Sequence, residues 1–434
     1  MDAYMILMIV VFVLGYFFIA TEHTFKINKS ATALLLAVLM WTSFTVFSGV
    51  FHPGTEEGHE RLIFHLGDTA EILFFLLGAM TIVETIDQHG GFSIITDRIA
   101  TKSKKKLLWV IAILTFFMSA VLDNLTTSIV MVALLRKLIA DKKDRWFFGG
   151  VVILAANAGG AWSPIGDVTT IMLWIKGNIS AGGVIMQTFI PSLICMVVPV
   201  FGISMMLKGE IGDASADKKM EVSAVSKRQS IVVLCVGVGS LLFTPVFKTI
   251  THLPPYMGIL LGLGILWVLT ELMHKHNPEV HQRMNIGNII TRVDTPSVLF
   301  FLGILMAVAA LAEAGHLKLL AEGLATLGGW QVTDILIGAL SSIVDNVPLV
   351  AAAMGMYDIA PSGVMAMDGP FWEFLAYCAG TGGSLLIIGS AAGVAVMGME
   401  KIDFMWYLKN ISIWALLGYL AGAGSYILMH MLLF

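Results

Sequence analysis

The sequence is poor in charged residues and in cysteine, and each shortage excludes a class of protein. Only 13% of its 434 residues are charged, whereas 57% are hydrophobic, and the mean hydropathy is +0.85. A soluble chain of this length cannot bury so much apolar surface in its core, so a lipid bilayer must surround most of it. With a net charge of −4 and no basic arm, nucleic acid is excluded as a partner. The three cysteines are scattered and form no metal-binding or redox spacing.

Motifs for covalent chemistry are also missing from the sequence. It contains no phosphate-binding loop, no nucleophile–base motif and no cluster of metal ligands. We therefore expect neither an enzyme nor an ATP-driven pump, and we expect no cofactor.

Long apolar runs predict an all-α polytopic membrane protein. Runs of about 18 residues or more are typical of spanning helices, and the clear ones are 4–20, 31–51, 182–207, 230–246, 257–272 and 411–432. Gly, Pro, Asn or Asp interrupts the other apolar stretches. We expect about nine crossing spans, two of them broken, together with two re-entrant hairpins.

The distribution of Lys and Arg predicts the first hairpin. Basic residues concentrate in the connections 22–29, 98–106, 136–145, 208–228 and 274–292, which the positive-inside rule assigns to the cytoplasm. Only about 30 apolar residues separate the second of these connections from the third, which is too few for two spans. A single span would place its ends on opposite sides. The segment is therefore predicted to enter, turn near Asp123–Ser128 and leave again.

An internal repeat relates two halves of the chain. The segment 119–124 resembles 341–346 at an offset of 222 residues, 157–170 resembles 380–393 at 223, and 73–80 resembles 299–306 at 226. The charge pattern makes the second hairpin open outward, so the two repeats would be inverted, which is typical of secondary transporters. The alternative is a duplicated helix pair whose glycines serve packing, but it leaves the Asp-Asn pair in each half unexplained.

These patterns divide the chain into four segments. They are an N-terminal transmembrane helix at 1–30, a first inverted repeat at 31–208 with its hairpin tip near 123–128 and a broken helix near 157–170, a cytoplasmic linker and connecting helix at 209–255, and a second inverted repeat at 256–434 with its tip near 345–348 and a broken helix near 380–393.

Three acids at the predicted breaks are the candidate ion and proton carriers: Asp123, Asp167 and Asp345. A carboxylate at membrane depth is costly and therefore indicates function, and no Lys or Arg lies within the broken segments. Asp167 has no acidic counterpart, because Ser390 occupies the equivalent position. The alternative role of Asp167 is to cap the helix that follows it.

Neutral oxygen atoms accompany these acids. They come from Asn124, Asn157, Asn346, Thr126, Thr127, Ser128, Ser163, Thr169, Thr170, Thr381, Ser384 and Ser390. Such a lining suits sodium or lithium, whereas a dicarboxylate would need positive charge at its site. Burial favours the protonated acid and sodium favours the ionised one. Competition of the two for one site predicts sodium/proton exchange. For Thr127 and Ser128 the alternative is a bond back to their own helix.

The Asp-Asn motifs and the stretch Asn157–Thr170 resemble the NhaD-type sodium/proton antiporters of bacteria, in the ion transporter superfamily. The resemblance implies a scaffold domain, a transport domain with opposed hairpins, elevator-like alternating access, a homodimer, activity in alkaline or saline conditions and a place in the bacterial inner membrane. By position, the ion-path residues would be Ser119, Asp123, Asn124, Asn157, Asp167, Thr169, Thr170, Ser341, Asp345, Asn346 and Ser384.

Other functions remain open from the sequence. A sodium-coupled carboxylate symporter or an arsenite-type anion permease uses the same fold. The symporters carry Ser-Asn-Thr at their hairpin tips, whereas this chain has Asp-Asn-Leu-Thr and Asp-Asn-Val-Pro, which argues against a carboxylate substrate. A channel and a membrane enzyme or scaffold are disfavoured by opposed hairpins that carry acids at depth.

Overall fold

The computed structural model describes residues 3–433 except 21, 48–56, 93, 95–100, 208, 212–225, 276, 278–279, 281–283 and 326–327. Over these residues the chain is helical and forms no strand beyond isolated bridges. Its helices are α1 (Ala3–Ala20), α2 (Glu22–Phe25), α3 (Lys29–Phe47), α4 (Glu57–Gln88), α6 (Lys104–Leu122), α7 (Asn124–Leu138), α8 (Lys142–Gly160), α9 (Val168–Lys176), α10 (Ala181–Met206), α11 (Lys227–Thr251), α12 (Pro255–His274), α14 (Ile286–Ile290), α15 (Thr295–Glu313), α16 (His316–Ala325), α17 (Trp330–Leu340), α18 (Asn346–Met356), α19 (Pro370–Gly382), α20 (Ala391–Glu400), α21 (Phe404–Asn410) and α22 (Ser412–Leu433).

The helices confirm the prediction of an all-α polytopic membrane protein. Among the described residues, eight are long and apolar enough to cross a bilayer, namely α3, α4, α6, α10, α11, α12, α15 and α22. Their outward faces carry large apolar side chains, such as Ile250 and Val268, that a bilayer would cover. Part of the predicted linker, residues 212–225, lies outside the described residues.

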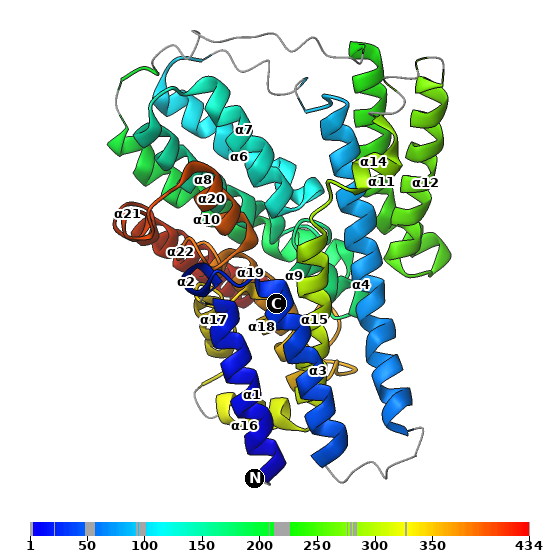
Figure 1. Ribbon diagram of the computed structural model, residues 1–434. Coiled ribbons are helices and arrows are strands. Elements are labelled where there is room, and N and C mark those ends of the chain that lie inside the picture. Colours follow the sequence, from blue (N-terminus) through cyan, green and yellow to red (C-terminus); the bar gives the residue numbers. More distant parts are fainter. Residues whose placement is uncertain are drawn as a thin grey trace.

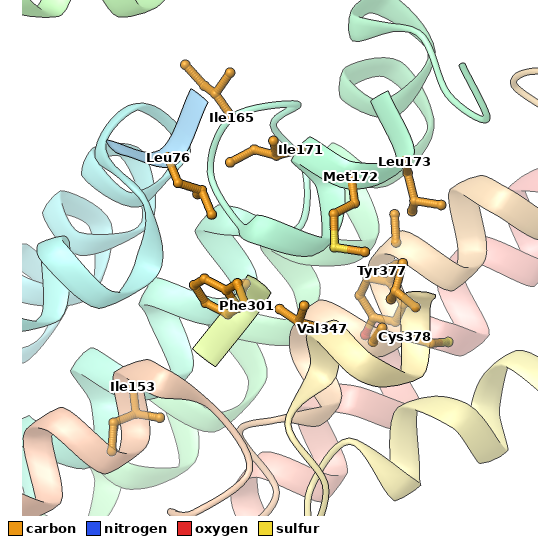
Figure 2. Close-up of a cluster of buried hydrophobic side chains, with 14 of the residues drawn as sticks. Leu76, Ile153, Ile165, Ile171, Met172, Leu173, Phe301, Val347, Tyr377 and Cys378 are labelled. Atoms are coloured by element: carbon orange, nitrogen blue, oxygen red, sulfur yellow. The ribbon is translucent and has the colours of Figure 1, made fainter. Parts of the chain in front are cut away.

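The helices pack as two groups, which we call the first and second bodies. The first body contains α1, α3, α4, α11, α12 and α15, and the second contains α6, α7, α8, α10, α17, α19, α20 and α22. Helices α9 and α18 lie between them and contact α4 and α15 respectively (Figure 1). Figure 2 shows the buried apolar side chains at this boundary, where Leu76 and Phe301 of the first body lie near Met172 and Val347. Polar contacts cross this boundary as well, from α11 to α9 and from α4 to α9.

Four interruptions divide helices of the second body and of the boundary. Asp123 separates α6 from α7 with a positive φ of 79°, and residues 161–167 separate α8 from α9. In the other half, residues 341–345 separate α17 from α18 and residues 383–390 separate α19 from α20. Each interruption falls at or within a segment in which the sequence places Gly, Asn or Asp.

The same contacts recur at equivalent positions of the two halves. The Ser119 hydroxyl donates to the carbonyl of Ala156 at 2.6 Å, and the Ser341 hydroxyl donates to the carbonyl of Ala379 at 2.9 Å. Gly159 packs against the carbonyl of Phe116, and Gly382 packs in the same way against that of Gly338. A Cβ atom on either glycine would overlap the carbonyl oxygen. Only glycine therefore allows α8 to approach α6, and α19 to approach α17, this closely. Recurring contacts of this kind support a duplicated unit.

Gly382→Ala is expected to destabilise the protein by about 1–3 kcal/mol, because the new methyl group must push α17 away from α19. Thermal unfolding in detergent measures the effect. Gly398→Ala is the matched control, because nothing lies within 4 Å of a Cβ at that helical position and alanine favours a helix. Equal unfolding temperatures for Gly382→Ala and the wild type would contradict the close contact.

Candidate functional site

Asp167 directly precedes α9, at the end of the interruption that follows α8. Its side chain is only 1% exposed. One carboxylate oxygen accepts hydrogen bonds from the Thr169 amide and the Thr169 hydroxyl, both at 3.0 Å. The first amides of a helix have no partner within the helix, so Asp167 does cap α9, as the alternative interpretation expected. Capping occupies one of its two oxygens.

The second oxygen of Asp167 faces the tips of both hairpins. The Asn124 amide nitrogen donates to it at 2.6 Å, and the Asn346 amide nitrogen lies 3.2 Å from it. Asn124 is the first residue of α7 and Asn346 is the first residue of α18. The asparagines of the two Asp-Asn motifs, which are 222 residues apart in the sequence, thus bond to the same carboxylate.

Asn157 connects this group to the fourth interruption. Its side-chain oxygen accepts from Asn124 at 3.1 Å, and its nitrogen donates to the hydroxyls of Ser384 and Ser390, each at 2.9 Å. Because Ser384 and Ser390 belong to residues 383–390, all four interruptions are linked through Asp167 and Asn157. Every side chain that bonds to Asp167 is electrically neutral.

The other two acids lie outside this network. Asp123 accepts from the amide and the hydroxyl of Thr126, each at 2.8 Å, and so caps α7. Asp345 caps α18 through the Val347 amide, and its carboxylate lies 3.7 Å from the ammonium group of Lys29. The expectation that these acids have no cationic neighbour is therefore wrong for Asp345. It failed because the cation comes from α3, far from the broken segments in sequence.

No single cluster contains the three acids. Within the described part of the chain, no three His, Cys, Asp or Glu side chains gather as a metal-binding group. A site centred on Asp167 therefore offers one carboxylate together with neutral amides and hydroxyls. One negative charge suits a monovalent cation better than a divalent one.

Most of the predicted hydroxyls serve the backbone in this structure. Ser119 and Ser341 bond to carbonyls of the broken helices, Thr170 bonds to the Asp167 carbonyl at 2.9 Å, and Thr381 bonds to its own helix. Thr127 is buried, and its hydroxyl has no partner among the described residues. These hydroxyls donate to backbone carbonyls and not to the Asp167 carboxylate, so they support the site without facing it.

Two acids that the sequence analysis did not single out, Asp334 and Glu373, are completely buried. Asp334 lies on α17 with 0% exposure, and neither of its carboxylate oxygens has a hydrogen-bond partner in the described residues. Ionising such a group is costly, so we expect Asp334 to be protonated. The sequence could have indicated Asp334 as a candidate, because this acid lies within the apolar stretch Trp330–Leu340.

Comparisons with known proteins identify related transporters. A protein-family model described as "Citrate transporter" matches residues 16–372. Sodium/proton antiporter 1 of Arabidopsis thaliana is 48% identical over 98% of this chain and 73% of its own length. The Na(+)/H(+) antiporter NhaD of Vibrio cholerae is 30% identical over 98% of this chain and 91% of its own.

The chain belongs to the NhaD-type sodium/proton antiporter family. It is a transporter, as its antiporter relatives are, and not an enzyme. Sodium/proton antiporter 2 of Arabidopsis thaliana, 45% identical over 98% of this chain and 99% of its own length, is a further relative. The Arabidopsis relatives contradict the expectation that this antiporter family is bacterial. Of the predicted location, the part that is confirmed is a multi-span membrane protein.

Asn157→Ala is expected to lower the free energy of unfolding of this NhaD-type chain by about 1–3 kcal/mol, because three buried partners on two other segments lose a hydrogen bond. Thermal unfolding in detergent reports the loss. Asn410→Ala is the control, since the Asn410 amide bonds only within its own helical turn, to Trp406. If both variants unfold at the same temperature, Asn157 does not link the interruptions.

Proposed function

We propose that this chain exchanges sodium or lithium for protons across a membrane, and that Asp167 carries either the cation or the proton. The observation that carries the proposal is the setting of Asp167, enclosed at 1% exposure and bonded only to neutral groups. The names of the antiporter relatives support the same conclusion. A positively charged side chain bonded to Asp167 would neutralise the carboxylate permanently. The carboxylate would then no longer attract a cation.

The asparagines allow one site to accommodate both forms of Asp167. Asn124 and Asn346 present their nitrogens to the carboxylate here. Rotating an amide by half a turn exchanges its nitrogen for its oxygen. A sodium ion beside Asp167 would then receive oxygen atoms from both hairpin tips, whereas a proton on Asp167 needs no such ligands. The two ions therefore exclude each other.

Movement of the second body against the first would give alternating access to this site. Two of the four interruptions linked to Asp167 lie between helices of the second body, and the other two join that body to α9 and α18. Helices α9 and α18 line the apolar boundary with the first body. We propose that the bodies act as transport and scaffold domains in an elevator-like cycle, and that two copies associate through the scaffold, as the family resemblance implies.

Carboxylate transport, which the description of the family model suggests, fits this site less well. The side chains that bond to Asp167 carry no positive charge. The N-termini of α7 and α18 would attract an anion, but Asp123 and Asp345 already cap them. A dicarboxylate would meet three acids near the hairpin tips and no cationic group that bonds to Asp167.

Sodium added to the purified protein in weak buffer is expected to release protons, because the cation displaces the proton of Asp167. A pH-sensitive dye measures the release. Asp167→Asn should lose most of the release and should abolish sodium-driven proton movement in proteoliposomes.

Asp358→Asn is the matched control, since Asp358 is exposed in the connection after α18 and should behave as the wild type. The proposal fails if Asp167→Asn releases as many protons as the wild type. It also fails if proteoliposomes respond to sodium only when citrate is present.

A further inference from the structure

An ion pair joins the two bodies beside the second hairpin tip. Lys29 is the first residue of α3 in the first body, and Asp345 caps α18 at the boundary. The ammonium lies 3.7 Å from the carboxylate, and it also lies 4.4 Å from the centre of the Phe300 ring. In Figure 1, α3 begins about midway along the length of α4.

A small cavity adjoins this ion pair. Its volume is about 70 Å³, which is room for more than one water molecule. Tyr16, Glu22 and Phe300 of the N-terminal elements and α15 line one side, and Ile388 and Ser390 line the other. The cavity thus lies between the two bodies.

The inner wall of the cavity belongs to the candidate site. Ser390 lines the cavity, and its hydroxyl accepts from the Asn157 amide at 2.9 Å. Asn157 is linked through Asn124 to Asp167. The cavity therefore adjoins a residue of the hydrogen-bond network around Asp167.

The two halves of the chain differ at this point. Within the described residues, no ion-pair partner lies beside Asp123, the counterpart of Asp345. The Lys29–Asp345 pair remains partly exposed, with side-chain exposures of 25% and 15%. A partly exposed ion pair contributes little net stability, so another cation that reaches the carboxylate can displace the ammonium.

We propose that Lys29 is a built-in competitor of the transported cation, and that its ion pair with Asp345 closes the cavity route to Asp167. Ammonium and sodium carry the same charge, so only one of them neutralises Asp345 at a time. When sodium arrives, Lys29 moves away and the route opens. When sodium has left, Lys29 returns and prevents an unpaired carboxylate at the boundary between the bodies. This inference rests on the proposed exchange at Asp167.

The first test compares sodium/proton exchange by Lys29→Met, Lys29→Arg and the control Lys105→Met in proteoliposomes. Lys105 is exposed at the start of α6. Lys29→Met should lower the KM for sodium several-fold, because the competitor is gone, whereas Lys29→Arg and Lys105→Met should keep the wild-type KM. In an Asp345→Asn background, Lys29→Met should no longer change KM. A purely structural role would change stability without this dependence on Asp345.

The second test measures whether the route opens, and it needs no transport. Ala391→Cys places a thiol in the cavity wall, in a protein whose exposed Cys235 is replaced by serine. Sodium should accelerate labelling by a hydrophilic thiol reagent several-fold and choline should not. Lys29→Met should label fast without sodium.

The outcomes separate this inference from the proposed function. A wild type that fails to exchange sodium for protons refutes the proposed function, and this inference with it. A wild type that exchanges normally, together with an unchanged KM and unchanged labelling in Lys29→Met, refutes the role of Lys29 alone.

Discussion

One carboxylate without a positively charged partner, enclosed where four helix interruptions meet, is the constraint on which the rest of the structure depends. Asp167 is 1% exposed and is bonded to a threonine and two asparagines. In a low-dielectric interior such a group binds a proton or a small cation readily. The proposed exchange of sodium for protons at Asp167 depends on these opposing effects of burial and charge.

Hydrogen bonds around the four interruptions lower the free-energy cost of breaking these helices. Breaking a helix within a membrane exposes carbonyl and amide groups that lipid cannot satisfy. Here hydroxyls of Ser119, Ser163 and Ser341 donate to carbonyls beside the breaks, and Tyr407 donates to the Ser384 carbonyl at 2.8 Å. Acids and Ser390 cap the helices that begin there. The interruptions are therefore hydrogen-bonded elements that bring distant segments together.

Local sequence predicted where the helices break, because Gly, Asn and Asp determine backbone geometry at their own positions. It also predicted that Asn124, Asn157, Asp167 and Asn346 belong near an ion path, and the structure brings these four together. It could not predict that Lys29 pairs with Asp345, since 316 residues separate them and the contact depends on how two bodies pack. The sequence also could not predict which hydroxyls donate to backbone carbonyls, because these hydrogen bonds depend on tertiary contacts.

The most direct test of the account is an infrared difference spectrum of the purified protein with and without sodium. Sodium binding should remove the carbonyl stretch of a protonated carboxylic acid and add carboxylate bands, and this difference should vanish in Asp167→Asn. A difference spectrum that is the same in Asp167→Asn and in the wild type would show that another acid exchanges the proton, and would contradict the central role of Asp167.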